Sequence, residues 1–222
     1  AALAGRAPYE QVLTHGFVVD GDGRKMSKSL GNVIAPQDVI DRYGAEMLRL
    51  WVAASDYSED VRISEPILAQ MADAYRKIRN TFRYLLGNLF DFSPARDRQP
   101  SEALPELDRW ALHRMQRLWE TVTEAYDGYQ FHQVFRAVYQ YCVLDLSSCY
   151  LDALKDRLYT EAAAGPARRC AQTVLYDILL GLVRMLAPIL PMTTEEVWQA
   201  LRGAGVVAPP PARGPKAGLT SG

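Results

Sequence analysis

Residues 21–32, which read GDGRKMSKSLGN, are the most informative stretch of this sequence. Three cations, Arg24, Lys25 and Lys28, fall within five residues of it. The glycines on both sides accept backbone angles that are closed to other residues, so we expect a pliable loop. Lysine carries a compact charge on a long flexible stem. Such a loop suits a polyanion that must be bound during a reaction and released afterwards.

Two interpretations fit the charge of this loop. In the first interpretation the loop is a solvated hairpin tip without a ligand, because short charge runs are often only surface. The second is a triphosphate site, in which Lys25 and Lys28 stabilise the charge that builds on pyrophosphate when a carboxylate attacks the α-phosphorus of ATP. The hydroxyls of Ser27 and Ser29 could add hydrogen bonds. The sequence has no Walker-type Gly-Lys-Ser/Thr loop, which excludes a P-loop NTPase.

Composition excludes several other classes of protein. The 222 residues suffice for one or two domains with a real core. The net charge is −1, so any nucleic acid would have to meet a local basic patch. The cysteines Cys142, Cys149 and Cys170 contain no Cys-x-x-Cys pair, which argues against a disulfide framework and a zinc site. We expect buried thiols, with Cys142 and Cys149 on one helix face. No apolar run is long enough to span a bilayer, and the absence of an initial Met suggests a fragment.

The hydrophobic pattern changes from mixed to helical near residue 64. Residues 12–19 (VLTHGFVV) are apolar and β-branched, which predicts a buried strand that leads into the loop. Within this strand Gly16 could mark a close approach of backbone or ligand. Two short helices are expected over 36–44 and 45–54, and an extended connector over 56–63. Longer amphipathic helices are expected over 64–89, 106–126, 131–154 and 167–186, with a loop over 92–105 and a short last helix capped by Thr193 or Thr194.

Three further expectations concern single positions on these helices. Leu144 is expected to face inward with Tyr141 and Leu151, because the three follow helical spacing. Arg168 and Arg169 are a weak candidate for RNA contact. First-turn surface charge is the preferred interpretation of that pair.

A stronger basic group lies on the first long helix. Arg76, Arg79 and Arg83 are spaced i, i+3 and i+7, and Lys77 adds a fourth charge. Arginine can pair with phosphates and stack on splayed bases, which is how proteins commonly bind single-stranded RNA loops. The alternative is a solvated helix face without a partner.

The string KMSKS at 25–29 resembles the signature loop of class I aminoacyl-tRNA synthetases. Its surroundings resemble the isoleucyl-tRNA synthetases over nearly all of residues 11–201, through stretches such as RNTFRYLLGNL and YLDALKDRLYT. Because valyl and leucyl enzymes share the loop, a fragment of either type is an alternative. A stand-alone helical tRNA-binding module without catalysis is another, and a structural bundle with an incidental basic loop is a third.

The resemblance implies a mainly α chain with two parts. A C-terminal remnant of a Rossmann-like catalytic α/β domain would be followed by the anticodon-binding helical bundle of a class I synthetase. The implied divisions are residues 1–44 for the end of the catalytic domain, 45–64 for a junction that contacts the tRNA stem, 65–202 for the bundle and 203–222 for a disordered tail.

The resemblance also implies a reaction. The full enzyme would activate isoleucine with ATP, bound with Mg²⁺ as substrate, and transfer it to tRNA(Ile). Lys28 would bind ATP, Lys25 would assist the pyrophosphate, and Met26, Ser27 and Ser29 would shape the loop. The family's His-x-Gly-His motif has no counterpart in the sequence, so the isolated chain is expected to be inactive. A monomer in the cytoplasm, without zinc or a membrane partner, is expected.

Overall fold

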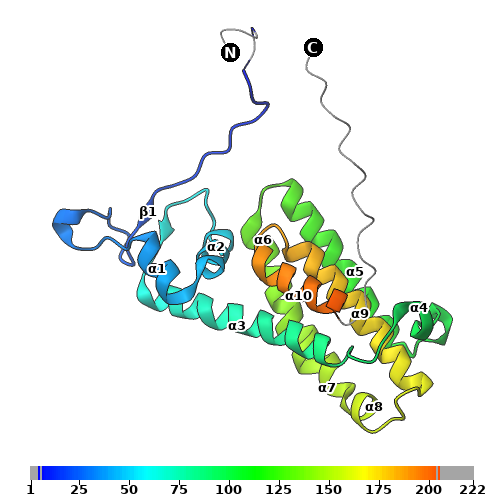
Figure 1. Ribbon diagram of the computed structural model, residues 1–222. Helices are drawn as coiled ribbons and strands as arrows, with labels where there is room; N and C mark the ends of the chain where they lie inside the picture. The colour runs from blue at the N-terminus through cyan, green and yellow to red at the C-terminus, as the bar shows by residue number, and fades with distance from the viewer. Residues whose placement is uncertain (1–4, 6, 204, 206–222) are drawn as a thin grey trace, which may run out of the picture.

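The computed structural model describes residue 5, residues 7–203 and residue 205. The predicted tail therefore lies, except for Gly203 and Gly205, outside the described residues. The described chain has two parts that share the long helix α3 (Glu65–Gly87) along one side. The first part, which we call the loop unit, carries the cationic loop, and the second is a helical bundle (Figure 1).

The loop unit contains two short strands and two helices. Its elements are β1 (Val18–Val19), the 3₁₀ turn η1 (Lys28–Leu30), α1 (Pro36–Tyr43), α2 (Ala45–Ala54) and β2 (Val61–Arg62). The strands pair in parallel, with Val18 opposite Val61 and Val19 opposite Arg62. A small core of Val39, Met47, Trp51, Ile63 and Leu68 holds the unit together. Both predicted short helices are confirmed.

The predicted buried strand over 12–19 is wrong for most of its length. Only its last two residues form a strand, and Val12 and Phe17 are 64% and 80% exposed. A strand is buried only when it has neighbours and covered faces, and β2 is the one strand paired with it in the described chain. The expectation for Gly16 is confirmed, because a side chain there would begin 2.1 Å from the Glu59 carbonyl oxygen.

The bundle is built from long helices close to the predicted ranges. Besides α3 these are α5 (Glu106–Asp127), α6 (Phe131–Gln140), α9 (Pro166–Leu186) and α10 (Pro191–Gly203). The π-helix η3 (Tyr141–Tyr150), α7 (Leu151–Ala153) and α8 (Lys155–Tyr159) extend α6, and the predicted loop over 92–105 contains α4 (Pro94–Asp97) and the 3₁₀ turn η2 (Ser101–Ala103). Most residues of α9 are buried, so it is the central helix of the bundle.

The π-helix corrects two expectations, one for Leu144 and one for the pair Cys142 and Cys149. Its turns are wider than those of an α-helix, because each N–H bonds five residues back. That winding turns Leu146 and Tyr150 into the core and leaves Leu144 59% exposed. It also separates the two cysteines that were expected to share a face. Cys142 is buried and Cys149 is exposed, so the expectation of a buried thiol is wrong for Cys149.

The expectations for Arg168 and Arg169 are also wrong, both as an RNA patch and as surface charge. The two side chains are buried, and Arg168 forms a two-pronged ion pair with Asp91, with Nη2 2.9 Å from Oδ1. Hydrogen bonds from Arg168 and Gln172 lower the pKa of Asp91 against the effect of burial. Sequence spacing cannot show this pair, because Asp91 lies 77 positions away in the chain.

Candidate functional site

The cationic loop is fastened at its base by Asp20. Its carboxylate accepts hydrogen bonds from the backbone N–H groups of Asp22 and Arg24, at 3.1 and 2.8 Å, and from Asn32 Nδ2 at 2.9 Å. The bond from Asn32 and the backbone bond from Arg24 together lower the pKa of Asp20 to about 2. The two ends of the loop are therefore held together by a charged acceptor that is ionised at neutral pH.

Asn32 closes the loop from its other end. The Asn32 amide oxygen accepts from Ser27 N–H at 2.9 Å, and its Nδ2 donates to the Lys25 carbonyl at 3.3 Å. Gly31 then leaves η1 with a φ of 65°, in the left-handed region that glycine adopts readily. Sequence reasoning missed Asp20 and Asn32. The sequence could have indicated these roles, because Asp20 directly precedes the first glycine of the loop and Asn32 directly follows the last one.

The two lysines of the loop are exposed. Among the described residues neither Lys25 nor Lys28 forms a salt bridge or a side-chain hydrogen bond. Arg24 differs, because it is paired with Asp20 and Asp22 at 3.1 and 2.7 Å. Figure 1 shows the loop projecting from the far end of the loop unit, away from the bundle. The loop thus presents two ammonium groups with no counter-charge supplied by the described chain.

The other three predicted loop residues lie at the foot of these lysines. Met26 is half-buried against the core of the loop unit. Ser27 caps η1, with its Oγ accepting from Leu30 N–H at 3.3 Å, and it lies 3.1 Å from Ser29 Oγ. The structure therefore brings all five predicted loop residues together. Their roles toward a nucleotide stay predictions.

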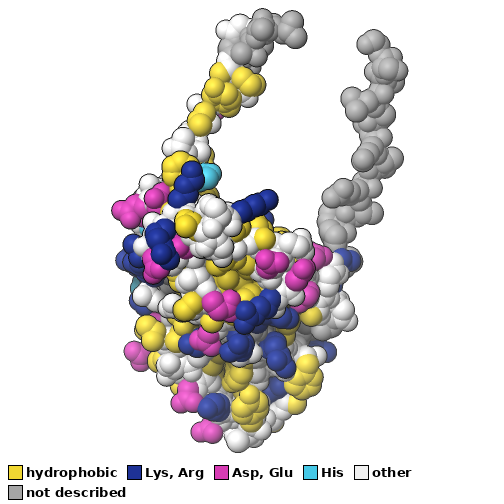
Figure 2. All heavy atoms as spheres, turned by 90° about the vertical axis from the view of Figure 1, so that its left-hand side faces the viewer, with side chains coloured by type: hydrophobic (Ala, Val, Ile, Leu, Met, Phe, Trp, Pro, Cys, Tyr) yellow, Lys and Arg dark blue, Asp and Glu magenta, His cyan; other side chains and the backbone are white. Residues whose placement is uncertain are grey.

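The four predicted RNA-contact residues lie along α3, where acids neutralise three of them. Arg76 and Lys77 are 3.2 and 3.0 Å from the carboxylate of Asp73. Arg79 is 3.6 Å from Glu196 of α10. Arg83 forms no salt bridge within the described part of the chain. Basic and acidic side chains also alternate on the face of the molecule in Figure 2.

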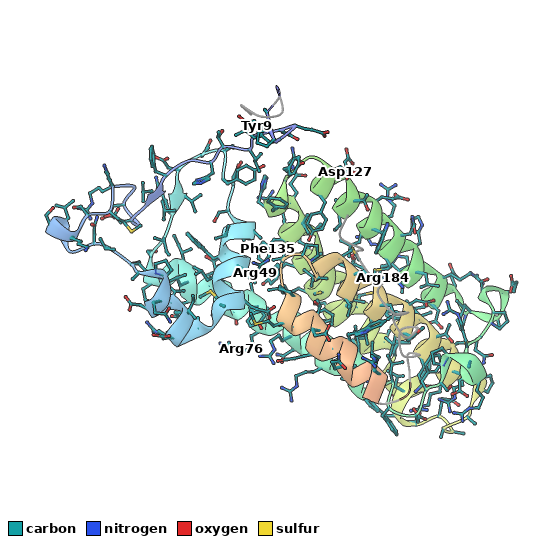
Figure 3. All side chains as sticks on the ribbon, turned by 45° about the horizontal axis from the view of Figure 1, so that its top comes forward. Tyr9, Arg49, Arg76, Asp127, Phe135 and Arg184 are labelled. Atoms are coloured by element: carbon teal, nitrogen blue, oxygen red, sulfur yellow. The ribbon has the colours of Figure 1, made fainter. Side chains whose placement is uncertain are left out.

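A clamp between α2 and residues 188–193, which form the turn before α10 and the start of α10, fixes the loop unit on the bundle. Glu46 is 6% exposed, and its carboxylate accepts from the N–H groups of Met192 and Thr193 at 2.6 and 2.9 Å. Arg49, labelled in Figure 3, donates to the carbonyls of Pro188 and Ile189 at 2.8 and 3.0 Å. An acid at a helix start and a cation at a helix end both complement the helix dipole. The predicted caps Thr193 and Thr194 instead lie inside α10, which begins earlier.

The described residues contain no group of three His, Cys, Asp or Glu side chains that could hold a metal ion. Within the same residues, no helix has the length and apolar character needed to cross a membrane.

Comparison with family models agrees with the loop and the bundle. Residues 1–64 match the model for class I tRNA synthetases (I, L, M and V), and residues 108–216 match the anticodon-binding domain of tRNA ligase. The chain belongs to the class I aminoacyl-tRNA synthetases.

Within that class the curated relatives of the chain include several isoleucine--tRNA ligases. It is 60% identical over 202 residues to the isoleucine--tRNA ligases of Moorella thermoacetica and Brevibacillus brevis. It is 59% identical over 200 residues to that of Symbiobacterium thermophilum. The first two alignments cover 91% of this chain and 22% of each relative, so the chain spans about a fifth of their length.

Solved structures share the fold at low sequence identity. A leucyl-tRNA synthetase from Agrobacterium radiobacter, in a ternary complex with tRNA and LeuAMS, matches with a TM-score of 0.61 at 23% identity, over 87% of this chain and 22% of that one. The methionyl-tRNA synthetase of Mycobacterium tuberculosis, with methionyl-adenylate, matches with a TM-score of 0.69 at 18% identity, over 89% and 42%. The mainly helical fold with a class I synthetase bundle is confirmed.

Proposed function

We propose that this chain supplies the ATP-binding loop and the tRNA-binding bundle of an isoleucine–tRNA ligase. That enzyme would activate isoleucine with ATP to isoleucyl-adenylate and transfer it to tRNA(Ile). The observation that carries the proposal is the exposed lysine pair, Lys25 and Lys28, on a loop whose base is fastened and whose tip is open. In the bundle, by contrast, Arg157 and Arg168 are paired with carboxylates and are committed to the fold.

The lysines would act by electrostatics rather than by covalent chemistry. Lys28 would bind the triphosphate of ATP, which arrives with Mg²⁺ as substrate, and Lys25 would assist as negative charge moves onto pyrophosphate. The half-buried Met26 and the hydroxyls of Ser27 and Ser29 would set the loop's shape. Asp20 and Asn32 would hold its ends, so that the tip can close on ATP without the base unfolding.

The bundle would bind the tRNA through the cations of α3. Arg83 forms no salt bridge within the described residues, so it can pair with a phosphate without first giving up a carboxylate. Arg76, Lys77 and Arg79 would exchange carboxylates for phosphates. The divisions proposed are 1–44 for the end of the catalytic domain, 45–64 for the junction and 65–202 for the bundle. A monomeric state and a cytoplasmic location are also proposed, as the resemblance implies.

Binding of tRNA(Ile) to the purified chain tests the bundle's part of this proposal. The dissociation constant should rise steeply with salt, because phosphate contacts release counterions. Arg83→Gln should weaken binding and reduce the salt slope by about 1. Binding that does not depend on salt, or no binding, would contradict the proposal.

Three further measurements separate the alternatives. The isolated chain should show no isoleucine-dependent ATP–pyrophosphate exchange, and measurable exchange would overturn the expected inactivity. Competition among tRNA(Ile), tRNA(Val) and tRNA(Leu) tests the type, for which the relatives at 55–60% identity favour isoleucine. A stand-alone tRNA-binding module without catalysis would bind tRNA equally well. If the chain were only such a module, Lys28→Ala in an enzyme that carries this sequence would leave the rate of amino-acid activation unchanged.

A further inference from the structure

A hollow of about 420 Å³ lies between the end of α2 and one face of α6. Its lining residues are Ala54, Asp56, His132, Phe135, Arg136, Tyr139 and Gln140. The five from α6 recur every three or four positions, so they form one face of that helix. Figure 3 shows Phe135 where α2 meets the bundle. Boundaries between structural units are common places for ligand sites.

The polar side chains of this hollow are largely unused by the protein. Arg136 and Gln140 are exposed and form no salt bridge or side-chain hydrogen bond within the described residues. His132 Nδ1 is buried without a hydrogen-bond partner in that same part of the chain. Asp56 uses its Oδ1 to accept from Ser58 N–H and Oγ, at 3.1 and 2.6 Å. The hollow is therefore lined by an unpaired guanidinium and an unpaired amide, together with an imidazole and a carboxylate.

An aromatic pair forms the apolar part of the same hollow. The rings of Phe135 and Tyr139 are stacked, with centroids 5.8 Å apart and planes 23° apart. Lys77 Nζ lies 5.8 Å from the Tyr139 ring centroid and donates to the Tyr139 hydroxyl at 3.2 Å. Flat rings beside cations are the surface on which nucleotides stack in proteins that bind single-stranded nucleic acid.

The charge of the hollow selects among nucleotide ligands. Arg136 contributes one positive charge, and the carboxylate of Asp56 contributes one negative charge. The nearby Lys77 is already partly neutralised by Asp73 at 3.0 Å. The net charge of the lining is therefore near zero, which disfavours a free nucleoside triphosphate with several negative charges. The exposed, unpaired Arg136 guanidinium can still pair with the single charge of one phosphodiester, whose sugar and base also offer groups to Gln140.

The same lysine places the hollow next to the proposed RNA-binding face. Lys77 belongs to α3, and it reaches across to α6 through Tyr139. An RNA chain on the cations of α3 could therefore continue past Lys77 toward Arg136. Figure 3 shows the neighbouring Arg76 pointing away from the protein.

We propose that this hollow binds one nucleotide of the tRNA, with Arg136 on its phosphodiester and the Phe135–Tyr139 pair against its sugar or base. This inference rests on the proposed tRNA-binding function and deepens it, because it adds a second contact site on a different helix. The contact is set by the RNA backbone, so it adds affinity and register more than sequence selectivity.

The test measures tRNA(Ile) binding by the whole chain, by fluorescence anisotropy over a range of salt. Arg136→Gln should weaken binding about 5- to 10-fold and lower the salt slope by about 1, because one phosphate contact is lost. Arg117→Gln on α5 is the matched control, since its side chain is 67% exposed and it does not line this hollow; it should change affinity less than 2-fold. Ultraviolet irradiation of the complex should cross-link RNA to the peptide that contains Phe135 and Tyr139.

The outcomes separate this inference from the function on which it rests. If Arg83→Gln weakens binding while Arg136→Gln behaves like Arg117→Gln, the hollow is not an RNA site and the α3 proposal stands. If the unaltered chain does not bind tRNA with a salt dependence, the proposed function fails and this inference fails with it. Because the side chains of Arg136 and Arg117 are both exposed, we expect glutamine at either position to leave the fold intact, and circular dichroism of each variant checks this.

Discussion

The bundle and the cationic loop use their charged side chains in opposite ways. In the bundle, the half-buried Arg157 and the buried Arg168 form two-pronged ion pairs with the carboxylates of Asp108 and Asp91. In the loop, Lys25 and Lys28 are exposed, and only the residues at the base of the loop are tied together. A paired charge is committed to the fold, whereas an unpaired exposed charge is available to a ligand. The contrast predicts large stability effects in one region and large binding effects in the other.

The largest stability effect is expected from Asp108→Ala in the bundle. Asp108 is fully buried, accepts from Arg157 Nη1 and Nη2 at 2.9 and 2.7 Å, and accepts from the Tyr150 hydroxyl at 2.8 Å. Its loss leaves a guanidinium without its partner, which typically costs about 3–5 kcal/mol of unfolding free energy. Urea denaturation measures this. Tyr150→Phe removes one hydrogen bond and should cost about 1 kcal/mol, and equal losses for the two variants would contradict the account.

A smaller loss is expected from Glu46→Ala, which cuts the clamp between the two regions. Two N–H groups at the start of α10 and the Tyr75 hydroxyl lose their acceptor. Leaving such buried donors unsatisfied should cost about 2–3 kcal/mol. Glu46→Gln keeps an acceptor and should lose about half as much. A loss under about 0.5 kcal/mol for Glu46→Ala would mean that the clamp does not hold the two regions together.

The sequence predicted the helices well because their signals are local. The apolar spacing of α3 and α5, and Pro36 and Gly44 around α1, place these helices within a few residues of the structure. The failures depend on distant partners or on unusual winding. Nothing near Arg168 indicates Asp91, and nothing near residues 12–19 shows how few strands lie beside them. The π-helix keeps an α-like sequence and still changes which side chains face inward.

The site was predicted in the same uneven way. The KMSKS string gave all five loop residues, because they are contiguous in the chain. It could not give Asn32 or Glu46 their roles, since those roles depend on hydrogen bonds across 12 and 146 positions.

A loop-specific effect of pH is expected, and it should appear only under acid conditions. The pKa of Asp20 is lowered to about 2. A lowered pKa stabilises the folded loop above the ordinary value near 4, and that contribution is lost as pH falls toward 2. Amide NMR shifts of residues 21–32 should report a transition near pH 2. In Asn32→Ala the midpoint should move up toward 3.8, and an unmoved midpoint would show that Asn32 does not fasten the loop.

The smallest perturbation is thiol labelling, which tests the winding of η3. Cys149 is exposed and should react with a maleimide at neutral pH. Cys142 is buried, and burial raises the pKa of its thiol to about 12, so it should stay unlabelled until the chain unfolds. Equal labelling of both cysteines in the folded chain would favour an ordinary α-helix over these residues.

The central claim is that the exposed lysines of the loop serve ATP and not the fold. The direct measurement is the rate of isoleucyl-adenylate formation, by rapid quench, in an isoleucine–tRNA ligase that carries this sequence with Lys28→Ala. We predict a fall of about 100-fold, the effect typical of losing one stabilising charge in a transition state, with tRNA affinity and unfolding free energy unchanged. An unchanged rate of adenylate formation, or a loss of stability in place of a loss of rate, would contradict the claim.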